Sequence, residues 1–258
     1  MSSLRFSEVE VLGTKFHQIT CCDLIDYIVH SAKKSEKTVI GNVNVRAMNF
    51  AHDLTWYRNF INQSDLVFCD GFGVLLAAKL NGYHLQSEHR MTCPDYIENL
   101  AKTCEKENVS LYLLAGEPGV VQETIRKFRV IAPGLKVGGH HGFFEKNGDE
   151  NTQVIEQINQ FKPDVLYVGF GMPLQERWII DNINEIDARV FLPLGACLDF
   201  YTGFVPRGPR WLTDRGLEWL TRLFVKPGKL WQRYIFGNTI FFCRVLKVWI
   251  FKALLNRK

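Results

Sequence analysis

Six short apolar runs, each containing or ending in Gly, Asp or Asn, constrain the fold more than any other feature of this chain. Each run is continuously apolar rather than alternating, as a strand buried on both faces requires. Amphipathic segments of helical length lie between them, for example 94–108 and 119–133. This alternation predicts an α/β fold with a doubly wound, mostly parallel, Rossmann-like sheet. The runs are TVIGNVN (38–44), DLVFCDG (65–71), VSLYLLAG (109–116), LKVGGHHG (135–142), DVLYVGFG (164–171) and ARVFLPLG (188–195).

The carboxyl ends of these strands are where a ligand is expected, because open parallel sheets bind ligands there. One stretch, VGFGMPLQERW (168–178), gathers glycines, an amide, a carboxylate and a guanidinium at a strand end. It is either a loop before a capped helix or part of a ligand site. The residues that close the runs are the candidates for this edge: Asn42, Asn44, Asp70, Gly116, Gly142 and the segment 169–175.

Asp70 and the two asparagines could carry chemistry or only structure. Asp70 follows a buried strand, where a carboxylate in a partly desolvated cleft can act as a general base. The alternative, favoured from Asp70 alone, is that it caps the helix that follows. Asn42 and Asn44 are two residues apart and point the same way in a strand. They would either hydrogen-bond a sugar or diphosphate, or join neighbouring loops.

Several well-known motifs are missing. LLAGEPGVVQETI resembles a strand, a glycine turn and a helix N-terminus, a plausible phosphate cradle, but it matches neither G-x-G-x-x-G nor G-x-x-x-x-G-K-[ST]. There is no D-x-D, no G-x-S-x-G and no cluster with metal-ligand spacing. His140 and His141 are adjacent and would face opposite ways in a strand. The sequence therefore predicts no metal site and no cofactor.

Charge divides the 258 residues unevenly. The net charge is +4, but residues 219–258 contain nine basic and no acidic residues, which leaves a net charge of −5 on the first 218. The sequence after about 205 is helical in character and holds four of the six tryptophans. We therefore expect a catalytic α/β domain at 1–205 and a helical, basic and aromatic appendage at 206–258. Such a tail indicates an anionic partner, or else a solvated helical face.

The segment 235–255 is apolar enough to suggest a transmembrane helix, but Arg244, Lys247 and Lys252 interrupt it. Arg244 and Lys247 fall with other basic residues on one side of a helical wheel, opposite Ile, Phe, Trp and Leu. This pattern favours a helix lying in the interface of an anionic membrane. A partner-binding or internal helix is the alternative. Nucleic acid fits the large apolar face less well.

The seven cysteines form no C-x-x-C pair and are scattered through apolar stretches, as free buried thiols would be in a reducing compartment. The start of the chain, MSSLRFSEVEVLG, shows no signal pattern. These features indicate a cytoplasmic body, and with the tail they predict a peripheral protein on the inner face of the cell membrane. A homo-oligomer stays open.

Eight stretches in order resemble the WecG/TagA/CpsF glycosyltransferase family (glycosyltransferase family 26). They are GNVNVRAMNFA, SDLVFCDGFGV, RMTCPD, LLAGEPGVV, GHHGFF, GFGMPLQERW, GACLDFYTG and RGLEWLTRL, between about 38 and 235. The resemblance implies inverting, metal-independent transfer of a hexose or N-acetylhexosamine from a UDP-sugar to a polyprenyl-diphosphate-linked acceptor sugar. Such transfers build bacterial surface polysaccharides and teichoic acids.

The resemblance also assigns roles to residues. Asp70 matches the family's proposed base, Asn44 its strand-end asparagine, Arg90 its pocket arginine and Gln175 its motif amide, expected to face the pocket. Substrate contacts are implied for Asn42, Gly71, Gly116, Gly119, Gly142, Phe143, Gly169 and Gly171, and acceptor contacts for Arg222, Lys229 and Arg233. Glu176 and Arg177 are expected to make local ion pairs or caps.

Three positions depart from the family pattern. Asn42 stands where the teichoic acid branch has Thr, RMTCPD replaces a more usual R-x-x-G-x-D, and Lys229 stands where Arg is common. The donor sugar is therefore open. Two functions of other classes are weighed beside the transferase: a Rossmann-type oxidoreductase, which lacks its dinucleotide fingerprint here, and a non-catalytic nucleotide-binding protein at the membrane surface.

Overall fold

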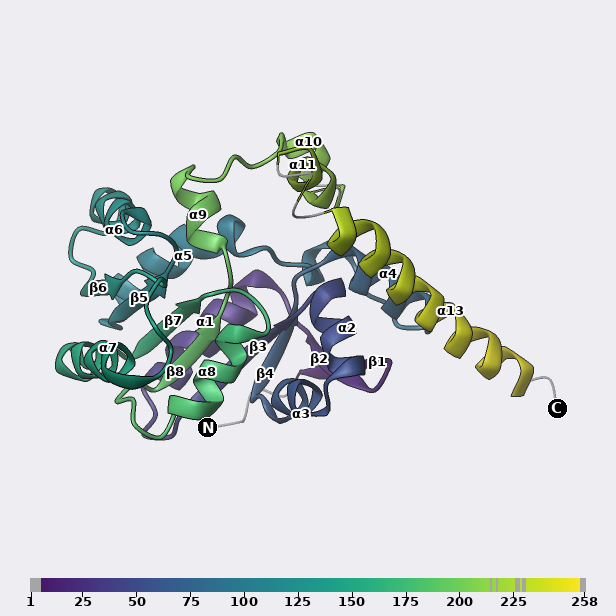
Figure 1. Cartoon of the computed structure of the whole chain (residues 1–258), viewed down its shortest axis with the longest axis horizontal. Helices are drawn as coiled ribbons and strands as arrows, with labels where there is room; N and C mark the ends of the chain where they lie inside the picture. Colours follow the sequence, from purple (N-terminus) through teal and green to yellow (C-terminus); the bar gives the residue numbers. More distant parts are fainter. Residues whose placement is uncertain (1–5, 214, 217, 226–227, 229–230, 256–258) are drawn as a thin grey trace.

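A six-stranded, wholly parallel sheet forms the centre of the computed structural model (Figure 1). The structure describes residues 6–213, 215–216, 218–225, 228 and 231–255, without the side chains of 222, 224, 225, 233 and 252. The strand order is β4-β3-β8-β7-β5-β6. Each strand falls within one of the six predicted runs, so the doubly wound fold is confirmed. The bounds are β3 Thr38–Val43, β4 Leu66–Cys69, β5 Leu111–Ala115, β6 Val137–His140, β7 Val165–Gly169 and β8 Val190–Pro193.

Helices cover both faces of the sheet, and each face has its own hydrophobic cluster. Strand β7 shows why its sequence is continuously apolar: Leu166 and Val168 enter one cluster, while Val165 and Tyr167 enter the other. The helices that cover the sheet are α1 Cys21–Ala32, α2 Val45–Asp53, α3 Thr55–Gln63, α4 Phe72–Leu80, α5 Cys93–Lys106, α6 Val120–Ile131, α7 Gly148–Phe161, α8 Leu174–Asn182 and α9 Cys197–Thr202, with a short 3-10 turn at Ser87–His89 (η1).

An antiparallel hairpin precedes the sheet and is not among the predicted elements. Its strands are β1 Ser7–Val11 and β2 Thr14–Gln18, joined at Leu12 and Gly13, both with positive φ. Two residues with positive φ form the type of turn whose twist matches a hairpin. Val9, Val11 and Phe16 join the cluster on one side of the sheet. The alternation around Leu-Gly is the signal that could have predicted it.

The C-terminal segment is helical, as expected: α10 Arg210–Thr213, α11 Glu218–Val225, a π-helical turn at Gln232–Phe236 (η2) and α13 Gly237–Leu255. The first half of α13 packs on α2 and α4, with Phe241 and Val245 fully buried in the core. Its second half extends away from the body (Figure 1). Helix α13 therefore packs on the body through its first half.

Arg244 does not lie on a free basic face, which corrects the helical-wheel interpretation. Its guanidinium donates to Asn49 Oδ1 at 3.0 Å and to Asp53 Oδ1 at 2.6 Å, both on α2. Asn49 Nδ2 in turn donates to the carbonyl of Gly237 at 2.8 Å. Packing on the body decided which side of α13 faces inward, so Arg244 binds a protein carboxylate.

The expectation that all seven cysteines are free thiols is wrong for two of them. Cys93 and Cys197 form a disulfide, with their Cα atoms 5.6 Å apart. They begin helices α5 and α9, which follow different strands and converge at the same edge of the sheet. Residues 104 positions apart are brought together only by this topology. Cys21, Cys22, Cys69, Cys104 and Cys243 are free.

Candidate functional site

A cavity of about 130 Å³ lies at the carboxyl ends of β3, β4, β7 and β8. Parallel pairing brings the loops after these four strands to one edge, which is where a doubly wound sheet binds ligands. Four predicted site residues line it: Asn42, Asn44, Asp70 and Gly171. Met172, from the predicted segment 169–175, lines it as well. The other lining residues were not predicted as site residues: Arg46, Thr92, Cys93, Pro94, Leu194, Gly195, Ala196, Cys197 and Phe200.

Asn44 links the start of α2 to Asp70. Its Oδ1 accepts from the backbone N–H groups of Arg46 and Ala47, at 3.0 and 3.1 Å, so it is the N-cap of α2. Its Nδ2 donates to Asp70 Oδ2 at 3.4 Å. Because the cap fixes the amide oxygen, the amide nitrogen is held toward the carboxylate. The N-cap of α4 is Gly71, one residue after Asp70, so the alternative of Asp70 at that cap position is not what the structure shows.

Asn42 lines the cavity and also joins two strands. It is 3% exposed, and its Nδ2 donates to the Pro193 carbonyl at the end of β8. The Asn42 side chain therefore joins β3 to β8, and a contact to a sugar or diphosphate stays a prediction. Gly71 permits the close approach of the neighbouring loop, since a Cβ there would lie 3.2 Å from Asn44 Cβ.

Gln175 does not face the cavity, which corrects the expected orientation. Its side chain is fully buried, and its Oε1 accepts from the N–H groups of Gly171 and Gly195, both at 3.0 Å. These two glycines line the cavity with φ of 88° and 58°, a region that favours glycine. Gln175 therefore acts through the loops after β7 and β8, which it holds together.

Glu176 is buried next to Gln175 and makes no ion pair among the described residues, so the first of the two expected roles, ion pair or cap, is not observed for it. It is 1% exposed; Oε1 accepts from Gln175 Nε2 at 2.8 Å, and Oε2 has no hydrogen-bond partner in the described part. Burial raises its pKa to about 7, although Gln175, the nearby Tyr57 hydroxyl and Arg46 favour the charged form. Arg177 does pair locally, with Asp181 at 2.9 Å.

Arg46 is the cation of this cavity, and Arg90 is not among its lining residues. Arg46 lies in the first turn of α2, with its guanidinium 5.2 Å from the centre of the Phe50 ring. Arg90 is half-buried beside the end of β4, where its backbone forms a parallel bridge with Cys69. The signal for Arg46 was its place two residues after Asn44.

The remaining predicted residues of this edge lie outside the cavity. Gly142 donates its N–H to the Gly116 carbonyl at 2.8 Å, and Gly169 packs so closely that a Cβ would lie 2.6 Å from the Gly195 carbonyl oxygen. Phe143 is 64% exposed. These residues shape or border the strand ends. Lys229 and the side chains of Arg222 and Arg233 lie outside the described residues.

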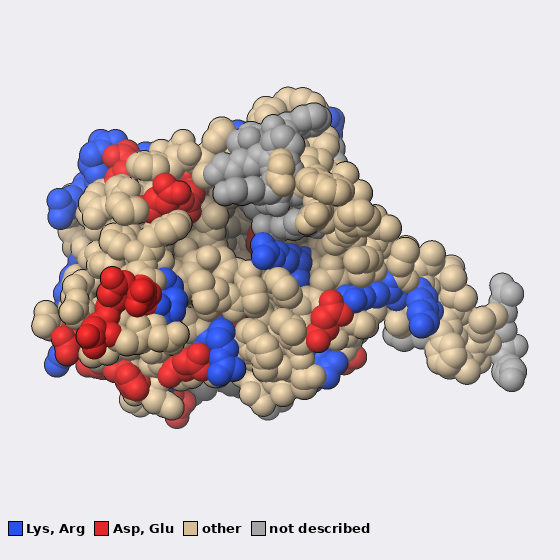
Figure 2. Space-filling view, viewed as in Figure 1, with Lys and Arg blue, Asp and Glu red and all other residues tan. Residues whose placement is uncertain are grey.

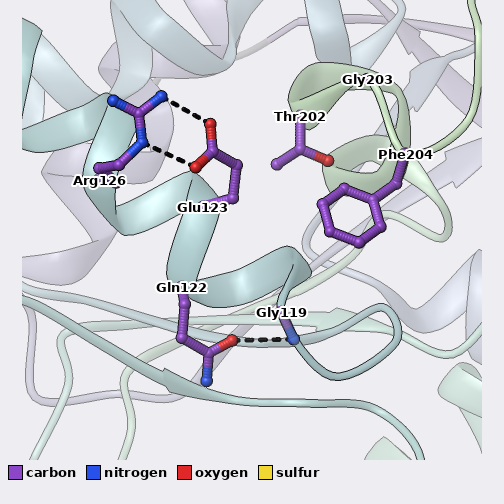
Figure 3. A pocket seen from close by; sticks show the side chains of 7 residues that line it. All are labelled: Gly119, Gln122, Glu123, Arg126, Thr202, Gly203 and Phe204. Atoms are coloured by element: carbon purple, nitrogen blue, oxygen red, sulfur yellow. Dashed lines mark hydrogen bonds and ion pairs between the residues drawn. The ribbon is translucent and has the colours of Figure 1, made fainter.

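A larger cavity, of about 610 Å³, lies between the start of α6 and residues 202–204 and includes Gly119 (Figure 3). Its two charged side chains pair with each other, Arg126 with Glu123 at 2.7 and 2.8 Å, and Gln122 Oε1 accepts from the Gly119 N–H at 3.1 Å. No carboxylate or cation there is left for a substrate, so the smaller cavity is the candidate active site. No group of three or more His, Cys, Asp or Glu in the described part of the chain could hold a metal ion.

Comparison with known proteins gives one family and a consistent set of relatives. The model of the glycosyl transferase WecG/TagA/CpsF family matches residues 9–254. Among curated proteins, the chain is similar to N-acetylglucosaminyldiphosphoundecaprenol N-acetyl-beta-D-mannosaminyltransferases of Staphylococcus aureus, for example from strains COL and MW2. Each is 25% identical over 229 residues, which cover 88% of this chain and 87% of the relative.

The buried carboxyl of Glu176 predicts a pH-dependent stability. Because its folded-state pKa is raised from 4.5 to about 7, wild-type protein should lose up to about 3 kcal/mol as pH rises from about 4.5 through about 7. Glu176→Gln keeps the acceptor for Gln175 without a charge, so it should gain stability over wild type at pH 8 relative to pH 5. Urea unfolding at both pH values measures this. Glu156→Gln, at an exposed site on α7, is the control, and parallel curves for wild type and Glu176→Gln would contradict the assignment.

Proposed function

Because the chain belongs to the glycosyl transferase WecG/TagA/CpsF family, we propose that it transfers a hexose or N-acetylhexosamine from a UDP-sugar to a polyprenyl-diphosphate-linked acceptor sugar. The activity for which its Staphylococcus aureus relatives are named supports this acceptor class. The observation that carries the proposal is the Asn44–Asp70 pair at the strand-end cavity, with Arg46 beside it.

The proposed reaction is a single displacement with inversion. Asp70 accepts the proton of the acceptor hydroxyl while that oxygen attacks the anomeric carbon of the donor, and UDP leaves with the electrons of the broken bond. Asn44 holds the carboxylate by its amide at 3.4 Å. Gln175 does not line the cavity and contributes by fixing the loops that contain Gly171 and Gly195. Arg90 supports the end of β4 next to Asp70.

The charge of the leaving diphosphate has to be met by fixed donors in a metal-independent reaction. Arg46 is the described side chain best placed for this, and the positive end of the α2 dipole lies beside it. Asn42 and the glycines Gly71, Gly116, Gly119, Gly142, Gly169 and Gly171, with Phe143, remain proposed donor contacts. Arg222, Lys229 and Arg233 remain proposed contacts to the acceptor diphosphate.

We also propose that the protein works at the inner face of the cell membrane through its C-terminal helix. The segment Tyr234–Leu255 is the one helix among the described residues that is long and apolar enough to cross a membrane, judged by length and composition alone. Uncharged residues cover most of the visible surface of α13, and Lys and Arg side chains lie along it (Figure 2). The domain division at 205 and 206 belongs to the same proposal.

The central test is Asp70→Asn. The change keeps the size and the contact to Asn44 but removes the proton acceptor, so turnover should fall by about 10²-fold or more with little change in UDP binding. A radiolabelled transfer assay measures turnover, and thermal stabilisation by UDP, compared with NAD and a DNA duplex, measures binding. Near wild-type turnover would remove Asp70 as the base. UDP binding with no transfer to any lipid-linked acceptor would favour the non-catalytic alternative.

A second test concerns metal. If Arg46, with the positive end of the α2 dipole, meets the diphosphate charge, activity should persist in EDTA, and Arg46→Gln should lower turnover by about 10-fold or more. The measurement is the initial rate with and without chelator. Loss of activity in EDTA with recovery on adding manganese would overturn metal independence.

A third test concerns the tail. Truncation after Leu246 keeps the docked half of α13, including Phe241, Arg244 and Val245, and removes the half that extends from the body. Since each basic residue near an anionic leaflet contributes about 1 kcal/mol and the apolar residues add more, vesicle binding should be lost while UDP binding stays. Co-sedimentation with phosphatidylglycerol vesicles checks this. Equal pelleting of truncated and full-length protein would contradict the proposed membrane role.

A further inference from the structure

Helix α4 carries an exposed apolar stripe in addition to its buried face. Phe72, Leu76 and Leu80 are 43%, 38% and 46% exposed, and their four-residue spacing places them on one side of the helix. The opposite side, with Val74, Leu75, Ala77 and Ala78, is buried in the core. A surface helix normally presents polar residues to solvent, so three large apolar residues in register need an explanation. We call Phe72, Leu76 and Leu80 the α4 stripe.

The α4 stripe lies next to the apolar surface of α13. A Cβ at Gly73 would be 3.7 Å from the Phe242 ring, so the two helices meet there at close range (Figure 1). From Phe242, the same side of α13 continues outward through Leu246 and Ile250, which are 53% and 45% exposed. The two rows of apolar side chains therefore start from one point of contact.

The charges along these helices match an anionic surface. Helix α4 contains no acidic residue, and its single charged residue, the exposed Lys79, falls on the same side as Phe72 and Leu76. Helix α13 also contains no acidic residue and exposes Lys247. Basic residues within an apolar face are typical of helices that lie on anionic lipid.

We propose that the α4 stripe lies against an anionic lipid bilayer together with α13, so that the catalytic body itself contacts the membrane. The proposal rests on the proposed membrane role of the tail and extends it to the helix that follows Asp70. The occupant is lipid rather than a second copy of the chain, because the stripe continues into a helix that is long and apolar enough to cross a membrane.

The position of α4 ties this contact to the reaction. Asp70 precedes Phe72 by two residues, which span at most about 7 Å of chain. The headgroup layer of one leaflet is about 5–7 Å thick. With Phe72 at the acyl boundary, Asp70 would lie at the depth of the headgroups, where the diphosphate of a lipid-linked acceptor also lies. The stripe thus determines how far the acceptor sugar must rise to reach the base.

The test uses the full-length chain with Leu76→Glu/Leu80→Glu and, as a matched control, Val130→Glu. Val130 is 74% exposed on α6, at the other end of the molecule from α13 (Figure 1). Binding to phosphatidylglycerol–phosphatidylcholine vesicles should weaken by about 10-fold or more in the α4 variant, because withdrawing one leucine from lipid lowers the binding constant by about that factor. Binding of the control variant should be unchanged. Thermal stabilisation by UDP checks that each variant is folded. If the glutamate variant is not folded by this criterion, Leu76→Ser/Leu80→Ser replaces it.

A second readout separates the stripe from the tail. The α4 variant should transfer sugar more slowly to a polyprenyl-linked acceptor in vesicles but at the wild-type rate to a short-chain acceptor in detergent. Wild-type vesicle binding by a folded α4 variant, with loss of binding on truncation after Leu246, would overturn the α4 proposal and leave the tail's role intact. If light scattering shows that wild type is a dimer and that the α4 variant differs from it only in being a monomer, the stripe mediates self-association instead.

Discussion

Parallel pairing of the strands is the constraint on which the site depends. Because β3, β4, β7 and β8 all run the same way, the loops that follow them must meet at one edge of the sheet. Asn44 and Asp70, 26 residues apart in the chain, come within hydrogen-bonding distance only because their strands are neighbours. Cys93 and Cys197 are joined at the same edge for the same reason.

A small buried polar group then fixes the wall of the cavity. The Gln175 amide gathers two glycine N–H groups from different loops, and Glu176 holds that amide from below. Burying such a polar group costs free energy unless each member is hydrogen-bonded. Glu176 Oε2 has no hydrogen-bond partner in the described part of the chain. The arrangement holds the loops in one position while leaving a carboxyl with a pKa of about 7 next to the site.

Helix α2 connects the C-terminal helix α13 to the cavity. Asn44 at the start of this helix faces the cavity, and Asn49 and Asp53 further along it bind α13. Arg244 therefore secures α13 to the body, which leaves the apolar surface of α13 with Lys247 for the proposed contact with the membrane. A helix of nine residues separates the proposed chemistry from the anchor.

The sequence by itself determined where along the chain the six strands lie, because continuously apolar runs without alternation are typical of strands covered on both faces of a sheet. It also identified Asp70 and Asn44, since residues that end parallel strands must lie at one edge. The direction of Gln175, the burial of Glu176 without an ion pair among the described residues, and the pairing of Cys93 with Cys197 were decided only by the tertiary structure. Each depends on which loop packs beneath or beside another, and local sequence preference carries no information about contacts between segments tens of residues apart.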